Sequence, residues 1–188
     1  SFDYHIALLL PFCIDSNDSI LHLDIDSISD FSQHELFKKS KISIDFFHGF
    51  LMALNNLIDE NLKISVFDIK KNEQSQFILN QIINERLLKD VDLIIGPLFT
   101  NNVIYFSENF YKKKPIVAPF SKKKHIVVNH PNVIQIQPSF ENQLNILSKY
   151  IFANHASDNI IFIRRDTMFK SSVQVMSEID SAIVQVDT

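Results

Sequence analysis

Residues 91–100, VDLIIGPLFT, decide the fold of this chain. An apolar run, Leu93-Ile94-Ile95, stops abruptly at Gly96-Pro97, and from Thr100 onward apolar residues recur at helical spacing as far as Phe110. A buried parallel strand that passes through a tight turn into a helix has this pattern. The stretch therefore predicts one strand–turn–helix unit of an α/β sheet.

This turn is also the most informative place for function. In open α/β sheets such turns lie at the carboxyl ends of the strands, where ligands bind. Thr100, Asn101 and Asn102 stand at the helix entrance, where free N–H groups and the helix dipole attract anions. Helix capping by these side chains is the alternative interpretation. The turn predicts a binding cleft but does not name the ligand.

Short apolar runs alternate with helical patterns along the rest of the chain. The predicted strands are residues 4–10, 64–67, 93–95, 116–118, 133–136, 160–163 and 184–186. The predicted helices lie around residues 46–58, 78–88, 100–114, 140–151 and 173–183, and residues 12–40 are expected to be irregular. This alternation, with strands that are apolar on both faces, predicts an α/β fold with a doubly wound parallel sheet.

Composition excludes several classes of protein. The chain has 188 residues and a formal net charge of −4, which argues against a general nucleic-acid surface. Only two glycines are present, so no Gly-rich phosphate loop or dinucleotide fingerprint can form. No apolar run approaches the roughly 20 residues of a membrane span. We therefore expect no nucleic acid, no nucleotide cofactor and no membrane span in this chain.

Metal and catalytic sites are not expected either. Cys13 is the single cysteine, and the Asp-rich residues 15–30 lack the turn glycine and closing Glu of a calcium loop. Seven histidines are dispersed without a metal-binding spacing. No nucleophile motif or defensible Ser-His-Asp grouping appears. The sequence predicts a protein that is not an enzyme and holds no cofactor.

Four segments of the chain are similar to a known family. They are Ile6–Pro11, Asp45–Leu54, Asp92–Leu98 and Pro115–Ser121. Over about residues 4–165 the chain resembles the type I periplasmic binding fold of the branched-chain amino acid receptor superfamily. It looks closest to envelope proteins that join this fold to a peptidoglycan-binding LysM module.

The resemblance implies a non-catalytic, ABC-transporter-like solute receptor of the periplasm or cell envelope. Its members close two lobes on a small ligand, and the turns that correspond to the third and fourth segments hold the ligand's carboxylate and amine. They are also longer than this chain. We therefore expect residues 1–137 to form a first lobe, and residues 138–188 to begin an incomplete second lobe of a fragment.

The candidate ligand-binding residues are Thr100, Asn101, Ser121, Lys123 and Arg165. Ser121 follows the fourth predicted strand in the position that Thr100 has after the third, and its value as a candidate comes from the pair. Lys123 belongs to a run of three lysines after that strand, and Arg165 ends a strand of the expected second lobe. These cations would favour an amino acid or organic anion. The alternative is a solvated charged face.

Bulky side chains at the same strand ends suggest a different function. Phe99 and Phe120 would fill the cleft, which favours a ligand-free interaction module that regulates or scaffolds envelope machinery. If both rings are buried there, truncation should destabilise the protein by ~3–5 kcal/mol. A hydrolase or transferase on the same topology is a third, weaker interpretation.

The sequence also predicts local structural roles for two further residues. Gly49, inside a predicted helix, is interpreted as a packing glycine that lets the helix approach the first strand closely. Asp68 ends the second strand, where it would face the cleft or cap the next helix.

Overall fold

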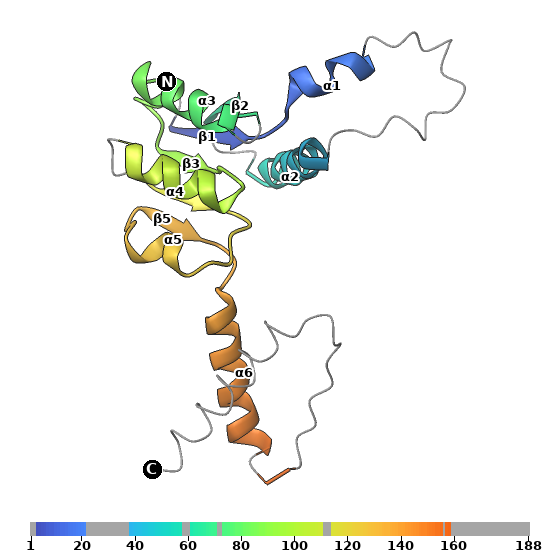
Figure 1. Ribbon diagram of the computed structural model, residues 1–188, viewed down its shortest axis with the longest axis vertical. Coiled ribbons are helices and arrows are strands. Elements are labelled where there is room, and N and C mark those ends of the chain that lie inside the picture. The colour runs from blue at the N-terminus through green and yellow to red at the C-terminus, as the bar shows by residue number, and fades with distance from the viewer. Residues whose placement is uncertain are drawn as a thin grey trace, which may run out of the picture. The chain divides into compact units, whose positions relative to one another are not determined.

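The computed structural model describes residues 3–21, 38–57, 61–70, 73–110, 114–155 and 157–158 of the chain. The chain divides into two compact units. The first comprises Ser1–Ser121 and His125–Gln137, and the second comprises Lys122–Lys124 and Pro138–Thr188. The first unit contains the sheet, and the second contains one long described helix (Figure 1). The assignment of the second unit as the start of a second lobe stays a prediction.

The first unit is built on a five-stranded parallel sheet. Its strands are β1 (Tyr4–Leu10), β2 (Leu62–Asp68), β3 (Leu93–Ile95), β4 (Ile116–Ala118) and β5 (Val133–Gln135). The order across the sheet is β2-β1-β3-β4-β5, and every neighbouring pair is parallel. The predicted parallel α/β sheet is thus confirmed, and the first, third and fourth strands have the predicted bounds.

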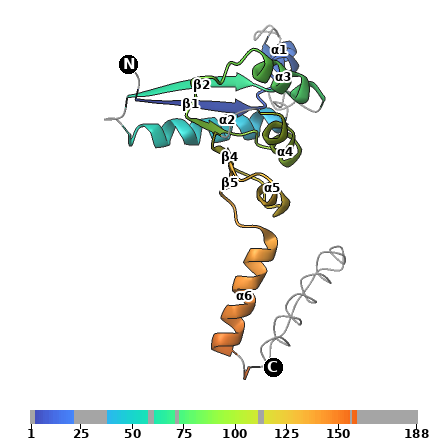
Figure 2. The same ribbon diagram turned by 90° about the vertical axis from the view of Figure 1, so that its left-hand side faces the viewer.

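Helices cover the two faces of the sheet unequally. The described helices are α1 (Ile14–Leu21), α2 (Lys38–Leu54), α3 (Glu73–Asn84), α4 (Thr100–Asn109), α5 (His125–Val128) and α6 (Phe140–His155). Side chains of α3, α4 and α5 pack into the larger core cluster on one face. The smaller cluster on the opposite face is built with α2, which runs alongside β1 (Figure 2).

The larger cluster holds most of the buried apolar residues. Phe106 of α4 is fully buried, and its ring stacks on that of Phe110 with 5.0 Å between the ring centroids. On the opposite face, Leu8, Leu10 and Leu98 are the buried members of the smaller cluster. Because burial of apolar surface drives folding, the face that carries α3, α4 and α5 contributes most of the stability.

Two sequence predictions about helices are wrong, and one helix was missed. Residues 12–40 were expected to be irregular, but α1 lies within them. The helix that begins at Thr100 ends at Asn109 rather than at the lysines that follow, because Phe110 adopts an extended backbone with φ −78° and ψ 113°. The short helix α5 was not predicted. Four residues give too few positions for a helical apolar period to be recognised.

The interpretation of Gly49 is also wrong. A Cβ atom built at this position meets no heavy atom within 4 Å, and the residue is exposed. No close approach to β1 therefore requires glycine here. The expected elements at residues 160–163, 173–183 and 184–186 lie outside the described residues.

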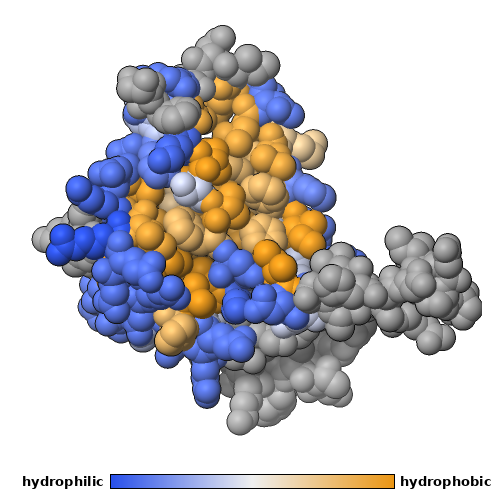
Figure 3. Space-filling model, turned by 90° about the horizontal axis from the view of Figure 1, so that it is seen from above, coloured by the Kyte–Doolittle hydropathy of each residue, from blue (hydrophilic) through white to orange (hydrophobic). Residues whose placement is uncertain are grey.

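Much apolar surface remains exposed on the first unit. Seen from the side of β2, the edge strand, apolar side chains gather over a broad central area (Figure 3). Exposed apolar side chains of this unit include Tyr4, Met52, Val66, Phe77, Ile134 and Ile136. Among the described helices, none is long and apolar enough to cross a membrane.

Candidate functional site

The strand order reverses direction at β1, between β2 and β3. The chain leaves β1 toward β2 on one side and later returns to β3 on the other side of β1. Such a reversal is the topological switch point of an open α/β sheet, and ligands bind outside the strand ends there. The loops after β1, β3 and β4 therefore contain the candidate residues.

The loop after β3 has a backbone that only glycine can adopt easily. Gly96 has φ +97°, and a Cβ at this position would lie 2.4 Å from the carbonyl oxygen of Leu9. Its N–H donates to the carbonyl oxygen of Val117 at 2.8 Å, which ties the turn to β4. The Gly96–Pro97 peptide bond is cis. Leu98 then turns inward and is buried against Leu8 and Leu10.

Helix α4 begins directly after this turn without a side-chain cap. Phe99 is the N-cap residue, with φ −99° and ψ 137°, and Thr100 is the first helical residue. The Phe99 carbonyl oxygen accepts the N–H groups of Asn102 and Val103, both at 3.0 Å. The N–H groups of Thr100 and Asn101 donate to no acceptor among the described residues. The capping interpretation of the Thr100 hydroxyl is therefore wrong.

The Thr100 hydroxyl instead meets that of Ser121. Thr100 Oγ1 and Ser121 Oγ lie 2.9 Å apart, and Ser121 is only 3% exposed. Either oxygen is able to donate in this contact. A ligand-binding role for the two hydroxyls stays a prediction.

Gln135, at the end of β5, holds the Ser121 loop in place. Its Nε2 donates to the carbonyl oxygen of Ser121 at 2.8 Å, and its backbone pairs with Ala118 in the sheet register. Sequence reasoning missed this residue. A polar side chain at the carboxyl end of an apolar strand was the available signal.

Asp68 fixes the loop after β1. The sequence left open whether this residue faces the cleft or caps the next helix, and its hydrogen bonds decide the matter. Its Oδ1 accepts the N–H groups of Cys13 at 3.0 Å and Lys70 at 2.9 Å, and its Oδ2 accepts that of Ile14 at 3.0 Å. Asp68 therefore caps α1, which precedes it in sequence, rather than the next helix. Because its oxygens are used in this way, Asp68 is not a ligand-binding group here.

The remaining candidates are Asn101, Lys123 and Arg165. Asn101 is exposed at the second position of α4. Lys123 is an exposed residue that is grouped with the second unit, and Arg165 lies outside the described residues. Convergence of these two cations on the cleft stays a prediction.

Phe99 and Phe120 flank the hydroxyl pair in sequence but do not form a buried plug. Phe120 is 40% exposed, and its ring meets that of Phe46 edge to face with 5.5 Å between centroids. Phe99 is half-buried at the start of α4. Phe120 thus borders a groove along α2, and the expected cost of 3–5 kcal/mol for its truncation is too large.

One hydroxyl–imidazole pair deserves comparison with a catalytic triad. His5 Nε2 and Ser65 Oγ lie 2.8 Å apart on the paired strands β1 and β2. The Asp92 carboxylate accepts the backbone N–H of His5 at 2.8 Å and does not orient the ring. Among the residues that the structure describes, the pair therefore has no third group of a triad. No cluster of three or more potential metal ligands occurs in the described part of the chain.

Comparison with solved structures identifies the fold. LpoA of Haemophilus influenzae superposes with a TM-score of 0.57 at 14% identity, over 99% of this chain and 28% of its own. An ABC transporter substrate-binding protein of Desulfitobacterium hafniense gives 0.56 at 12% identity, over 97% and 47%. The leucine-binding protein LivK of Thermotoga maritima gives 0.51 at 14% identity, over 97% and 46%.

The chain therefore has the type I periplasmic binding fold that the sequence resemblance predicted. At these identities the similarity establishes the fold alone. The chain spans less than half the length of each of these three proteins. No protein-family model matches the sequence, and no curated protein matches it either.

Proposed function

We propose that this chain supplies the ligand-binding edge of a non-catalytic receptor of the periplasm or cell envelope. It would bind a small polar ligand with a carboxylate or another anionic group, such as an amino acid or an organic acid. The substrate-binding proteins that share the fold support this proposal. The hydroxyl pair of Thr100 and Ser121 carries it.

The donors at this edge suit an anion. The N–H groups of Thr100 and Asn101 stand at the positive end of the α4 dipole, and Thr100 also contributes the hydroxyl that meets Ser121. The Asp68 carboxylate already accepts three backbone N–H groups, so it does not oppose an anion at these donors. The donors therefore favour a ligand that carries a carboxylate. Lys123 and Arg165 are proposed to add charge once the second lobe closes.

A thermal-shift screen against amino acids and small organic acids tests this function. A specific ligand at 100 times its dissociation constant should add roughly 2.7 kcal/mol to the free energy of unfolding. The variants Thr100→Val and Ser121→Ala should abolish the shift. Ser107→Ala is the matched control, because this α4 hydroxyl donates to the Ile104 carbonyl oxygen away from the candidate edge.

A ligand-free interaction module is the alternative function. The Thr100 and Ser121 hydroxyls hydrogen-bond to each other, so neither requires a ligand as a partner. Under this alternative no compound in the screen shifts the melting temperature. The same substitutions would then alter stability without affecting any small-molecule response.

A further inference from the structure

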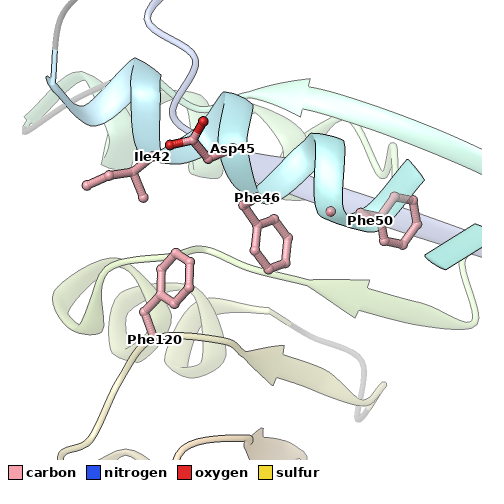
Figure 4. Close-up of a pocket in the computed structure, with 6 residues that line it drawn as sticks. Ile42, Asp45, Phe46, Phe50 and Phe120 are labelled. Atoms are coloured by element: carbon pink, nitrogen blue, oxygen red, sulfur yellow. The ribbon is translucent and has the colours of Figure 1, made fainter. Parts of the chain in front are cut away.

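Two apolar surfaces of the first unit are open among the described residues. One is a groove formed by side chains of α2 and of the loop after β4, where the rings of Phe46 and Phe120 face each other (Figure 4). The other is the outer edge of β2, on the side of the unit that Figure 3 shows. This second surface combines apolar side chains with backbone hydrogen-bonding groups, so it specifies its partner more closely.

The hydrogen bonds between β1 and β2 show which backbone groups of β2 point outward. The Ile69 N–H donates to the Leu10 carbonyl oxygen at 3.0 Å, and the Asn61 carbonyl oxygen accepts the Asp3 N–H at 2.9 Å. Because the direction of these groups alternates along a strand, the odd-numbered residues of β2 face β1. The even-numbered residues therefore point their N–H and C=O groups outward, and they are Leu62, Ile64, Val66 and Asp68. No described strand pairs with this edge.

The side chains of β2 leave its outer edge open to pairing. Ile64 packs into the smaller cluster on the α2 face, and Val66, on the same face by alternation, is 43% exposed. On the opposite face, Phe67 packs against the larger cluster and Lys63 is exposed. Natural edge strands are usually protected by short length, proline, bulges or charges. β2 has seven residues, no proline and an uninterrupted register with β1.

Two copies of β2 fit each other when they run antiparallel about a two-fold axis at Ser65. This residue is the centre of the seven-residue strand, so all seven residues of each copy are paired. Each outward-facing residue then meets an outward-facing residue of the second copy, as Ile64 meets Val66, and such pairs exchange two hydrogen bonds. Lys63 lies opposite Phe67 of the second copy. The two lysines are four residues apart along the strands, or about 13 Å, so no like charges oppose each other.

We propose that the intact protein forms a symmetric dimer in which β2 pairs antiparallel with β2 of a second copy, centred on Ser65. The same patch serves on both chains, as a two-fold contact requires. The axis is perpendicular to the sheet and keeps the α2 faces on one side. Ile64 and Val66 of one copy therefore cover Val66 and Ile64 of the other, and the two sheets become continuous.

Disulfide cross-linking of the intact protein tests the pairing at the axis. Facing residues of a non-hydrogen-bonded antiparallel pair have Cα atoms about 4.5 Å apart, which is within the range for a disulfide. Ser65→Cys should therefore form a cross-linked dimer under mild oxidation. Lys63→Cys is the matched control, because this position is more exposed but lies far from its copy. We expect at least about tenfold more cross-linked dimer from Ser65→Cys, with Cys13 buried in both variants.

A proline on the outer edge tests the backbone contacts. Val66→Pro removes an outward N–H group and leaves the bonds between β1 and β2 in place, because the Val66 backbone groups point away from β1. Val66→Ala keeps this N–H group and is the control. Sedimentation equilibrium should give a dimeric mass for the parent and for Val66→Ala. The dissociation constant of the dimer should be at least about tenfold larger for Val66→Pro, with an unchanged circular dichroism spectrum.

Two results would overturn the proposal. A monomeric mass at every concentration, with no more cross-linked dimer from Ser65→Cys than from Lys63→Cys, would show that the edge is free or covered by something else. A dimer that persists in folded Val66→Pro would place the interface elsewhere. If Val66→Pro does not fold, the cross-linking comparison decides alone. Neither result depends on Thr100 and Ser121, so the ligand-binding proposal stands or fails separately.

Discussion

Gly96 lies so close to Leu9 that no other residue fits without displacement of the backbone. A Cβ atom at Gly96 would stand 2.4 Å from the Leu9 carbonyl oxygen and 3.2 Å from the Leu9 carbonyl carbon. The residue also has φ +97°, a conformation that L side chains rarely adopt. This contact joins the turn after β3 to the end of β1, and so sets the position of Thr100.

Gly96→Ala should therefore destabilise the protein strongly. The backbone conformation alone should cost about 1–3 kcal/mol, and the clash with Leu9 adds to this cost. Urea unfolding followed by circular dichroism measures the change. Gly49→Ala is the matched control, because its Cβ meets nothing within 4 Å and alanine favours a helix. A smaller loss in the free energy of unfolding for Gly96→Ala than for Gly49→Ala would contradict the prediction.

Asp68→Ala should loosen α1 and the loop after β1. The change removes the acceptors of three backbone N–H groups, those of Cys13, Ile14 and Lys70. We expect a loss of about 0.5–2 kcal/mol in the free energy of unfolding, the usual cost of losing a helix cap. Amide hydrogen exchange should accelerate at Cys13 and Ile14. Asp90→Ala, in an exposed turn, should leave both measurements unchanged.

A double-mutant cycle measures the bond between Thr100 and Ser121. Thr100→Val and Ser121→Ala each remove one hydroxyl, and each should cost about 0.5–1.5 kcal/mol. The double variant should cost less than the sum of the two, with a coupling energy of similar size. Strict additivity would mean that the 2.9 Å contact contributes nothing to stability.

Truncation of two phenylalanines to alanine should lower the free energy of unfolding by different amounts. Phe106 is fully buried and stacks on Phe110, so Phe106→Ala should cost about 3–5 kcal/mol. Phe120 is 40% exposed and has one edge-to-face ring contact, so Phe120→Ala should cost only about 1–2 kcal/mol. Chemical unfolding of both variants makes the comparison. Equal costs would show that the groove beside Phe120 is filled.

Asp15 and Lys70 should make stability depend on pH at both extremes. The hydrogen bond and charge of Lys70 lower the pKa of Asp15 below its ordinary 3.8, and Asp15 in turn raises the pKa of Lys70 above 10.5. The Asp15 contribution is present above pH 3.8 and is lost as the pH falls through the lowered pKa. The Lys70 contribution is present below pH 10.5 and is lost as the pH rises through the raised pKa.

Asp15→Asn tests this dependence. The variant should be slightly less stable than the parent at neutral pH and equally stable well below pH 3.8, where the parent carboxylate is protonated. The difference should be small and should shrink further in salt, because both groups are exposed to solvent. Urea unfolding at the two pH values measures it. A difference that persists in acid would show that the side chain acts through something other than its charge.

The sequence by itself determined the sheet and its central turn, because those signals are local. The apolar run Leu93-Ile94-Ile95 follows Asp92 and ends at Gly96-Pro97, as a short buried strand does, and the chain turns there before Thr100. The same reasoning located β1 and β4 to the residue. It also placed Thr100 and Ser121 at strand ends, since each follows an apolar run.

Only the tertiary structure decided what those strand ends contact. Helix α1 forms where Asp68 accepts the N–H groups at the start of the helix, including that of Ile14. Asp68 is 54 residues away from Ile14 in the sequence, so no local pattern encodes this partner. The bond between Thr100 and Ser121 requires β3 and β4 to be neighbours, which the strand order fixes. Gly49 was misinterpreted because helical spacing identifies an apolar face without showing how close its partner lies. The distance between two packed segments depends on tertiary packing, which the spacing of apolar residues in the sequence does not specify.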